Sequence, residues 1–138
     1  MIDRELVTRK VVLISKDVEE LRKLAAGGLE PYLADPMKEL VAERLLERTI
    51  TRMIDINYHL ITESGRPPPK DYYESFIDVG AMGILEREFA ARIAVSAGLR
   101  NRIVHEYDDI DPGKVFDAIK VALADLPVYL DAVLKFPS

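Results

Sequence analysis

The sequence has no cysteine and no tryptophan, and aromatic residues make up only 7% of its 138 positions. The absence of cysteine excludes disulfide bonds, thiolate zinc sites and cysteine nucleophiles, and it fits a reducing compartment. With so few aromatic residues, the core has to be built from leucine, isoleucine, valine and alanine. The chain is long enough to bury such a core, and we expect residues 1–138 to form a single domain.

Long apolar runs and an excess of positive charge are also missing. No apolar run is long enough to span a bilayer, and acidic residues (Asp3 and Glu5) interrupt the N-terminus where a signal peptide would be hydrophobic. We therefore expect a cytoplasmic protein without membrane contact. The formal net charge of −5 argues against sequence-independent coating of DNA, which requires many cations. A small cationic pocket for one or two phosphates remains compatible with this charge.

Apolar residues recur at intervals of three and four, the spacing of amphipathic helices, and no segment alternates with the period of a strand. Glycine and proline interrupt this pattern at 27–28, 65–69 and 108–113. The predicted helices span residues 3–26, 37–63, 72–79, 85–104 and from Lys114 onwards, with Asp3 as the first N-cap. Pro127 either kinks the last helix or begins a new one. We predict an all-α fold, an antiparallel bundle of four to five helices.

The densest group of chemically active side chains lies at the end of the fourth predicted helix. Residues 100–107 read Arg-Asn-Arg-Ile-Val-His-Glu-Tyr, and the chain has only one other histidine, His59. A histidine exchanges protons near neutral pH, and an arginine offers paired, permanently charged donors to phosphate oxygens. Together they can cleave RNA without a metal, by moving protons at the 2′-hydroxyl and the leaving 5′-oxygen and by stabilising charge on phosphorus.

This Arg-x4-His-x-Tyr string, preceded by Ala97-Gly98-Leu99, resembles the signature of HEPN ribonucleases and in particular of HepT-like toxins. The similarity covers most of the chain. It includes Asp3-Arg4-Glu5-Leu6, Glu47-Arg48, Asn57-Tyr58-His59-Leu60-Ile61, Tyr73-Glu74-Ser75-Phe76 and Ile110-Asp111. The resemblance implies a HEPN-like bundle and a metal-independent endoribonuclease toxin that needs no cofactor and leaves a 2′,3′-cyclic phosphate.

The resemblance also implies roles for single residues. Arg100 and His105 would be catalytic, Asn101 would orient a group in the site, Arg102 would add positive charge, and Tyr107 would contact RNA or hold His105. In HepT-like toxins the tyrosine at the position of Tyr107 receives AMP from a partner nucleotidyltransferase, which silences the nuclease. The implied partners are therefore RNA, a cognate nucleotidyltransferase antitoxin and a second copy of the chain in a homodimer.

Helix geometry constrains this site. At about 100° per residue, Arg100 and His105 lie roughly 140° apart on an ideal helix, so they cannot both face one phosphate from a straight segment. Either the helix loosens near residues 104–105, or two chains contribute side chains across an interface. In a homodimer, paired motifs would form a cationic groove that one acidic subunit lacks, and Gly98 would permit close helix approach.

A second polar group lies on the helix predicted at 37–63, where Arg48, Arg52, Asp55 and His59 share one face. Asp55 and His59 either support the catalytic pocket or belong to a face that is solvated or salt-bridged between subunits, and we favour the second interpretation. Asn57, within the apolar stripe, is either a buried, hydrogen-bonded core residue or faces the pocket, and we favour the structural role. Neither histidine follows a glutamate by three residues, so no carboxylate-bridged metal site is predicted.

Two other classes of function stay open. The first alternative is a non-catalytic helical binding module that partners a nucleotidyltransferase. The second is a purely structural helical dimer. Arginine and histidine near a helix C-terminus also complement the helix dipole, so the motif by itself does not exclude these alternatives. The grouping of arginine, asparagine, histidine and tyrosine favours the ribonuclease.

Overall fold

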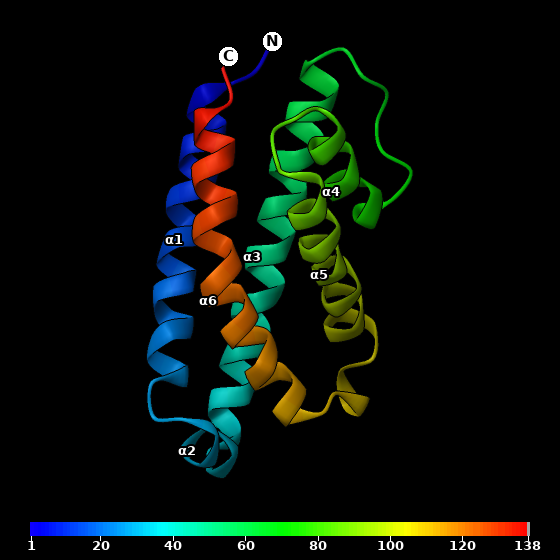
Figure 1. Ribbon diagram of the computed structural model, residues 1–138. Coiled ribbons are helices and arrows are strands. Elements are labelled where there is room, and N and C mark those ends of the chain that lie inside the picture. Colours follow the sequence, from blue (N-terminus) through cyan, green and yellow to red (C-terminus); the bar gives the residue numbers. More distant parts are fainter. Residues whose placement is uncertain (138) are drawn as a thin grey trace.

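The computed structural model describes residues 1–137, and within them it contains six α-helices and no strand. The helices are α1 (Arg4–Ala25), α2 (Leu29–Ala34), α3 (Pro36–Glu63), α4 (Tyr72–Ala81), α5 (Arg87–His105) and α6 (Pro112–Lys135), with a 3₁₀ turn at Tyr107–Asp109. The long helices run up and down side by side, with α1 and α6 on one side of α3 and α4 and α5 on the other (Figure 1). This arrangement confirms the predicted all-α antiparallel bundle.

Aspartate residues begin four of the six helices. The carboxylates of Asp3, Asp35, Asp71 and Asp111 each accept a hydrogen bond from a backbone N–H in the first turn of the helix that follows. Such N-caps satisfy donors that have no partner inside the helix. The structure confirms the predicted cap at Asp3. It starts α6 at Pro112, two residues before the predicted Lys114, because a proline is well tolerated directly after the cap.

One further detail differs from the sequence-based prediction, and a second settles the alternative that Pro127 left open. Residues 29–34, predicted as a connection, form the short helix α2, because Pro31 lies in its first turn, where no N–H is needed. This helix buries Tyr32, whose ring packs 5.1 Å from that of Phe116. Pro127 lies within α6, which continues as one helix to Lys135.

The core is formed by the apolar stripes that the spacing predicted. Buried members include Val7, Val11, Ile14, Val18 and Leu21 of α1, Leu46, Ile50, Met53, Ile54, Leu60 and Ile61 of α3, and Val115, Ile119, Leu126 and Val133 of α6. Asn57 is completely buried among them and hydrogen-bonded, which confirms its structural role. No helix within residues 1–137 is both long and apolar enough to cross a membrane.

Helices α5 and α6 stand apart in Figure 1, with α3 visible between them. Helix α5 packs on α3 and α4, whereas α6 packs on α1, α2 and α3. The side chains of α3 therefore form the floor of a groove between α5 and α6. The end of α5 that carries the Arg-x4-His-x-Tyr string lies along this groove.

Candidate active site at the end of helix α5

The Arg-x4-His part of the motif lies entirely within α5, which remains α-helical up to His105. The first residue beyond the helix, Glu106, still donates its N–H to the carbonyl of Arg102 at 2.7 Å. The helix therefore does not loosen near residues 104–105, and that explanation of how Arg100 and His105 meet is wrong. The regular hydrogen bonding of the last turn keeps the two Cα–Cβ directions well apart.

Three parts of the chain surround the guanidinium of Arg100. Its Nε donates to Thr51 Oγ1 of α3 at 3.3 Å, and its Nη1 donates to Asn101 Oδ1 at 3.3 Å. Its Cζ lies 5.2 Å from the ring centroid of Tyr72, the first residue of α4. Arg100 is half-buried, so these contacts hold a charged group at the edge of the bundle rather than in free solvent.

Asn101 contacts the arginine and lies about one helical turn before the histidine. It receives the hydrogen bond from Arg100, and it lies four residues before His105, so Asn101 and His105 occupy the same face of α5. Both are exposed. Arg100, Asn101 and His105 thus follow one another around the end of the helix, and of the two neighbours of Asn101 in this group the guanidinium of Arg100 is the one that contacts it.

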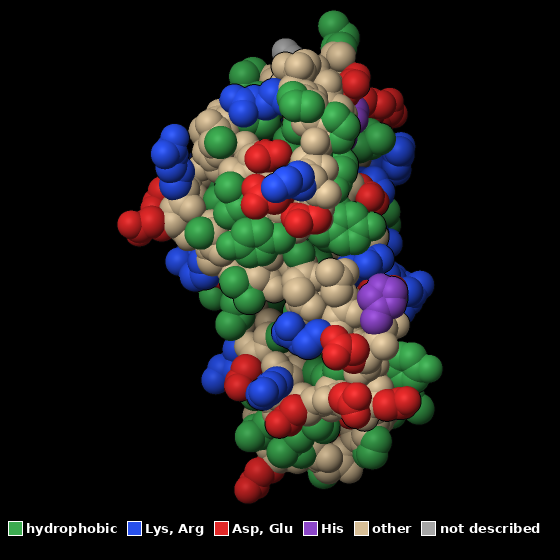
Figure 2. All heavy atoms as spheres, turned by 90° about the vertical axis from the view of Figure 1, so that its right-hand side faces the viewer, with side chains coloured by type: hydrophobic (Ala, Val, Ile, Leu, Met, Phe, Trp, Pro, Cys, Tyr) green, Lys and Arg blue, Asp and Glu red, His purple; other side chains and the backbone are tan. Residues whose placement is uncertain are grey.

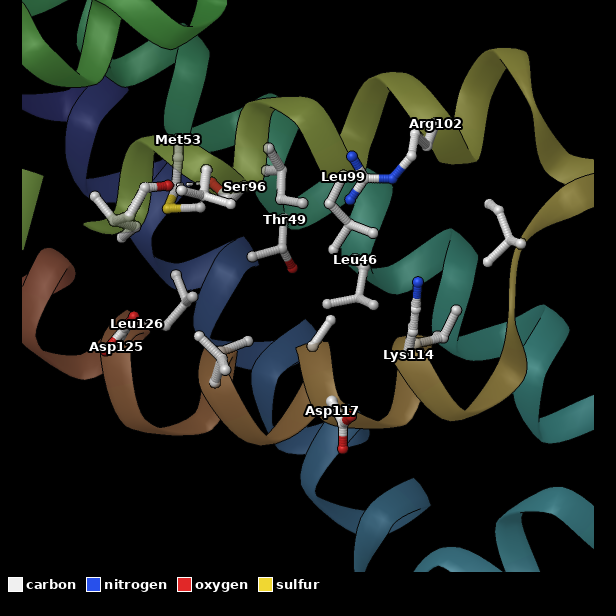
Figure 3. Close-up of a pocket in the computed structure, with 18 of the residues that line it drawn as sticks. Leu46, Thr49, Met53, Ser96, Leu99, Arg102, Lys114, Asp117, Asp125 and Leu126 are labelled. Carbon is white, nitrogen blue, oxygen red and sulfur yellow. Dashed lines mark hydrogen bonds between the residues drawn. The ribbon is translucent and has the colours of Figure 1, made fainter. Parts of the chain in front are cut away.

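Arg102 is directed elsewhere. Figure 3 shows its side chain reaching from α5 toward the groove between α5 and α6, on the same side as Leu99. Arg100 and Arg102 lie about 200° apart on the helix, so one faces α3 and α4 and the other faces α6. The structure therefore brings Arg100 and Asn101 together and places Arg102 on a separate surface.

The groove between α5 and α6 has a volume of about 580 Å³ and is mostly apolar. Its lining includes Leu46, Thr49, Ile50 and Met53 of α3, Ile93, Ser96 and Leu99 of α5, and Val115, Ala118, Val121 and Leu126 of α6 (Figure 3). Thr49 is completely buried, and its hydroxyl has no hydrogen-bond partner within the described residues. Charged side chains of both signs, among them Arg102, Lys114 and Asp117, stand at the edges. No local sequence pattern indicates this groove, because its lining comes from three separate helices.

Tyr107 lies in the 3₁₀ turn directly after α5, and 66% of its surface is exposed. Its acidic neighbours Glu106, Asp108 and Asp109 are exposed too. Figure 2 shows basic side chains beside the exposed histidine on this side of the molecule and acidic ones nearby. The tyrosine hydroxyl is therefore accessible to a large partner.

The polar face of α3, formed by Arg48, Arg52, Asp55 and His59, lies against α1. Arg48 and Arg52 both bind the buried carboxylate of Asp17, with contacts of 2.8–3.0 Å. Asp55 accepts a hydrogen bond from Lys10 at 2.9 Å. The face is thus salt-bridged, but its partners come from α1 of the same chain and not from a second subunit as the favoured interpretation had it.

His59 completes the same face. Its Nε2 accepts the backbone N–H of Asp3 at 2.8 Å, so its partner also lies at the start of α1. Asp55 and His59 thus form hydrogen bonds with α1 and its N-cap, whereas Arg100 contacts α3 and α4. Thr51 and Tyr72, which do contact Arg100, were missed because no local spacing relates them to the motif.

An antiparallel helical bundle with Arg-x4-His-x-Tyr at the end of a long helix defines a HEPN-type protein. The family model for Ribonuclease HepT-like proteins matches residues 14–133 of this chain. The chain therefore belongs to the HepT-like ribonuclease family. The resemblance that the sequence motif indicated is confirmed.

Individual relatives agree with this assignment. The chain is 40% identical to the tRNA nuclease HepT of Aphanizomenon flos-aquae (strain 2012/KM1/D3), over 98% of this chain and 92% of the relative. Among solved structures, a tri-AMPylated Shewanella oneidensis HEPN toxin in complex with MNT antitoxin superposes with a TM-score of 0.85 at 19% identity, covering 93% of this chain and 96% of that one. The cytosolic protein YutE from Bacillus subtilis, of unknown function, superposes with a TM-score of 0.83 at 14% identity, covering 96% and 88%. These two likenesses establish a shared fold.

Proposed function

We propose that the protein is a metal-independent endoribonuclease and the toxin of a toxin–antitoxin pair. The observation that carries this proposal is the grouping of Arg100, Asn101 and His105 at the exposed end of α5, on a chain of the HepT-like ribonuclease family. The relative from Aphanizomenon flos-aquae is a tRNA nuclease, so tRNA is the first substrate to test. The proposed place of action is the cytoplasm.

The proposed mechanism divides the chemistry between the two side chains. His105 is exposed at the helix end, removes the proton of the attacking 2′-hydroxyl and gives a proton to the leaving 5′-oxygen. Arg100 uses Nε and Nη1 to bind Thr51 and Asn101, and its remaining N–H groups stabilise the charge that develops on the phosphate. The 2′-hydroxyl attacks phosphorus, the bond to the 5′-oxygen breaks, and a 2′,3′-cyclic phosphate results.

A second copy of the chain is the proposed occupant of the groove between α5 and α6. The groove is apolar and open, and Val95 and Val121 on its flanks are 62% and 56% exposed. Its edges carry both signs of charge, which allows a two-fold related copy to place opposite charges against each other. Such a homodimer brings two copies of the motif, including Arg102 and Tyr107, around one cleft.

Modification of Tyr107 by a nucleotidyltransferase antitoxin is the proposed means of silencing. Its hydroxyl is exposed, and it follows His105 by two residues. Attached AMP would add a negatively charged phosphate next to Arg100 and His105 and repel an RNA phosphate. The solved HEPN toxin of the same fold is AMPylated and bound to its MNT antitoxin, which supports this proposal.

The activity is tested with purified protein and tRNA in the presence of a chelator. We expect cleavage by the wild type, and a loss of at least about 100-fold in Arg100→Ala and in His105→Ala, because each removes a transition-state contribution of that order. Arg9→Ala, on the exposed surface of α1, is the matched control. If the wild type cleaves no RNA and both variants behave like it in cells, the chain is instead a binding module for the nucleotidyltransferase.

The silencing step is tested by co-expression with a cognate nucleotidyltransferase antitoxin. We expect a mass increase by whole AMP units, located on Tyr107, and loss of nuclease activity. Tyr107→Phe lacks the acceptor hydroxyl and should stay unmodified and toxic, whereas Tyr73→Phe, also an exposed tyrosine, should be modified like the wild type. Modification of Tyr107→Phe to the same extent would contradict the assignment.

A further inference from the structure

The aromatic ring beside Arg100 belongs to a residue whose position is fixed by the fold. Tyr72 is the first residue of α4, directly after the N-cap Asp71, whose carboxylate accepts the N–H of Glu74 at 2.8 Å. The Tyr72 carbonyl also accepts a hydrogen bond from the buried Ser75 hydroxyl at 2.7 Å. These contacts anchor the backbone of Tyr72 to the bundle.

A second aromatic residue supports the ring of Tyr72. Tyr58 of α3 meets it nearly edge-on, with ring centroids 6.2 Å apart and an interplanar angle of 82°. This T-shaped arrangement is a favourable one for aromatic pairs, because the positive edge of one ring faces the negative face of the other. Tyr58 is half-buried and packs against the core, so the pair of rings forms a platform rather than two loose side chains.

Arg100 lies on this platform and is tied down at the same time from α3. Its guanidinium stands over the Tyr72 ring at 5.2 Å, within the range of a cation–π interaction. The hydrogen bond from Nε to Thr51 Oγ1 fixes the rotation of the guanidinium about its own axis. The ring and the hydroxyl come from two different helices, so together they restrict both the position and the plane of the charged group.

We propose that Tyr72 and Thr51 are positioning residues, which hold the Arg100 guanidinium in the orientation that meets the phosphate of the substrate. This inference rests on the proposed ribonuclease activity. A free arginine side chain has many rotamers, and a displacement of about 1 Å from the productive geometry lowers a rate by about 100-fold. Neither residue exchanges a proton or touches the reacting atoms in this scheme.

Kinetics on a defined RNA test the proposal. Tyr72→Leu removes the platform, and we expect kcat to fall about 10- to 100-fold while KM changes less than about 3-fold. Tyr72→Phe keeps the ring and should restore most of the rate, and Thr51→Val should lower kcat in the same way as Tyr72→Leu. The control is Tyr73→Leu, the neighbouring exposed tyrosine, which should cleave like the wild type. A wild-type kcat in Tyr72→Leu overturns the positioning role.

A measurement without RNA separates this inference from the activity itself. In ¹⁵N-labelled protein the Nε–H signal of Arg100, identified by its loss in Arg100→Ala, should be displaced by the ring current of Tyr72. Tyr72→Phe should keep the displacement, and Tyr72→Leu should return the signal to the position of exposed arginines. An unchanged signal in Tyr72→Leu overturns the platform, whereas a changed signal in a protein that cleaves no RNA upholds the platform and overturns the proposed function.

Discussion

The hydroxyl of Tyr129 in α6 lies 2.5 Å from the amide oxygen of Asn57 in α3 and donates to it inside the core. The carbonyl of Met53 is also within 3.0 Å of this hydroxyl. The amide nitrogen of Asn57 donates to Ser75 Oγ of α4 at 3.1 Å, so one buried asparagine joins three helices. Burial raises the pKa of Tyr129 well above its ordinary value, which keeps the donor protonated. This network sets the register of α4 and α6 against α3.

Removing the donor of this network should destabilise the bundle. Tyr129→Phe leaves the Asn57 oxygen without its partner at a completely buried position, and we expect a loss of about 1–3 kcal/mol in the free energy of unfolding. Urea unfolding followed by circular dichroism measures it. Tyr73→Phe, which removes an exposed hydroxyl, serves as the control and should change the stability little. A loss below about 0.5 kcal/mol in Tyr129→Phe would show that the core tolerates the unpaired oxygen.

The carboxylate of Asp17 neutralises two arginines at the interface of α1 and α3. Its side chain is only 6% exposed, while those of Arg48 and Arg52 are 40% and 20% exposed. Asp17→Asn leaves both cations without their counter-charge, and we expect a loss of about 1.5–3 kcal/mol, the range for hydrogen bonds to charged groups. Glu19→Gln breaks only the exposed pair with Arg22 and should cost less than about 0.5 kcal/mol. Equal losses in the two variants would contradict the role of burial.

Close contact between α4 and α5 depends on Gly80. A Cβ added there would lie 2.7 Å from the Cβ of Ala90, which is shorter than real contacts allow. Gly80→Ala should therefore cost about 1–3 kcal/mol through overpacking. The double variant Gly80→Ala/Ala90→Gly empties the opposing position and should recover part of this loss. Thermal unfolding of the four proteins measures the coupling, and simple additivity of the two changes would refute the close approach.

Glu43 carries an unfavourable charge near the start of α3. Burial, and secondly the carboxylate of Glu39, raise the pKa of Glu43 above its ordinary value. The unfolded chain therefore releases this proton at lower pH than the folded chain, so the stability falls as the pH rises through the titration and stays lower at neutral pH. Glu43→Gln should stabilise the protein at pH 7 by about 0.2–0.5 kcal/mol. Unfolding experiments should show this gain disappear at about pH 3, where the carboxyl groups are protonated. A gain that persists there would point to a cause other than charge.

The proposed dimer makes a prediction about the groove between α5 and α6. Val121→Asp places a charge on the apolar flank of the groove, and we expect it to shift the protein to a monomer in sedimentation experiments, because an unpaired charge is costly to bury. Val12→Asp, on the exposed face of α1, is the matched control and should leave the assembly unchanged. A wild-type protein that is monomeric at micromolar concentration would contradict the proposed dimer.

The sequence by itself determined the features that depend on neighbours along the chain. The helices follow from apolar periods of three to four residues, whereas the N-cap at Asp3 and the breaks at glycine and proline follow from the backbone chemistry of those residues. The Arg-x4-His-x-Tyr motif can be found without knowledge of the fold. The short helix α2 was missed because Pro31 reads as an interruption unless its place in the first turn is known.

Only the tertiary structure decided which surfaces the polar side chains share. Thr51 binds Arg100 from 49 residues earlier in the chain, and this contact depends on how α5 packs on α3. Asp55 and His59 have side chains suited to a catalytic pocket. The packing of α1 against α3 instead places Asp55 beside Lys10 and His59 beside the backbone N–H of Asp3. The groove exists because α5 packs on α3 and α4, whereas α6 packs on α1, α2 and α3. A periodic pattern defines a face of a helix, whereas the residues opposite that face are set by long-range packing, which local spacing does not encode.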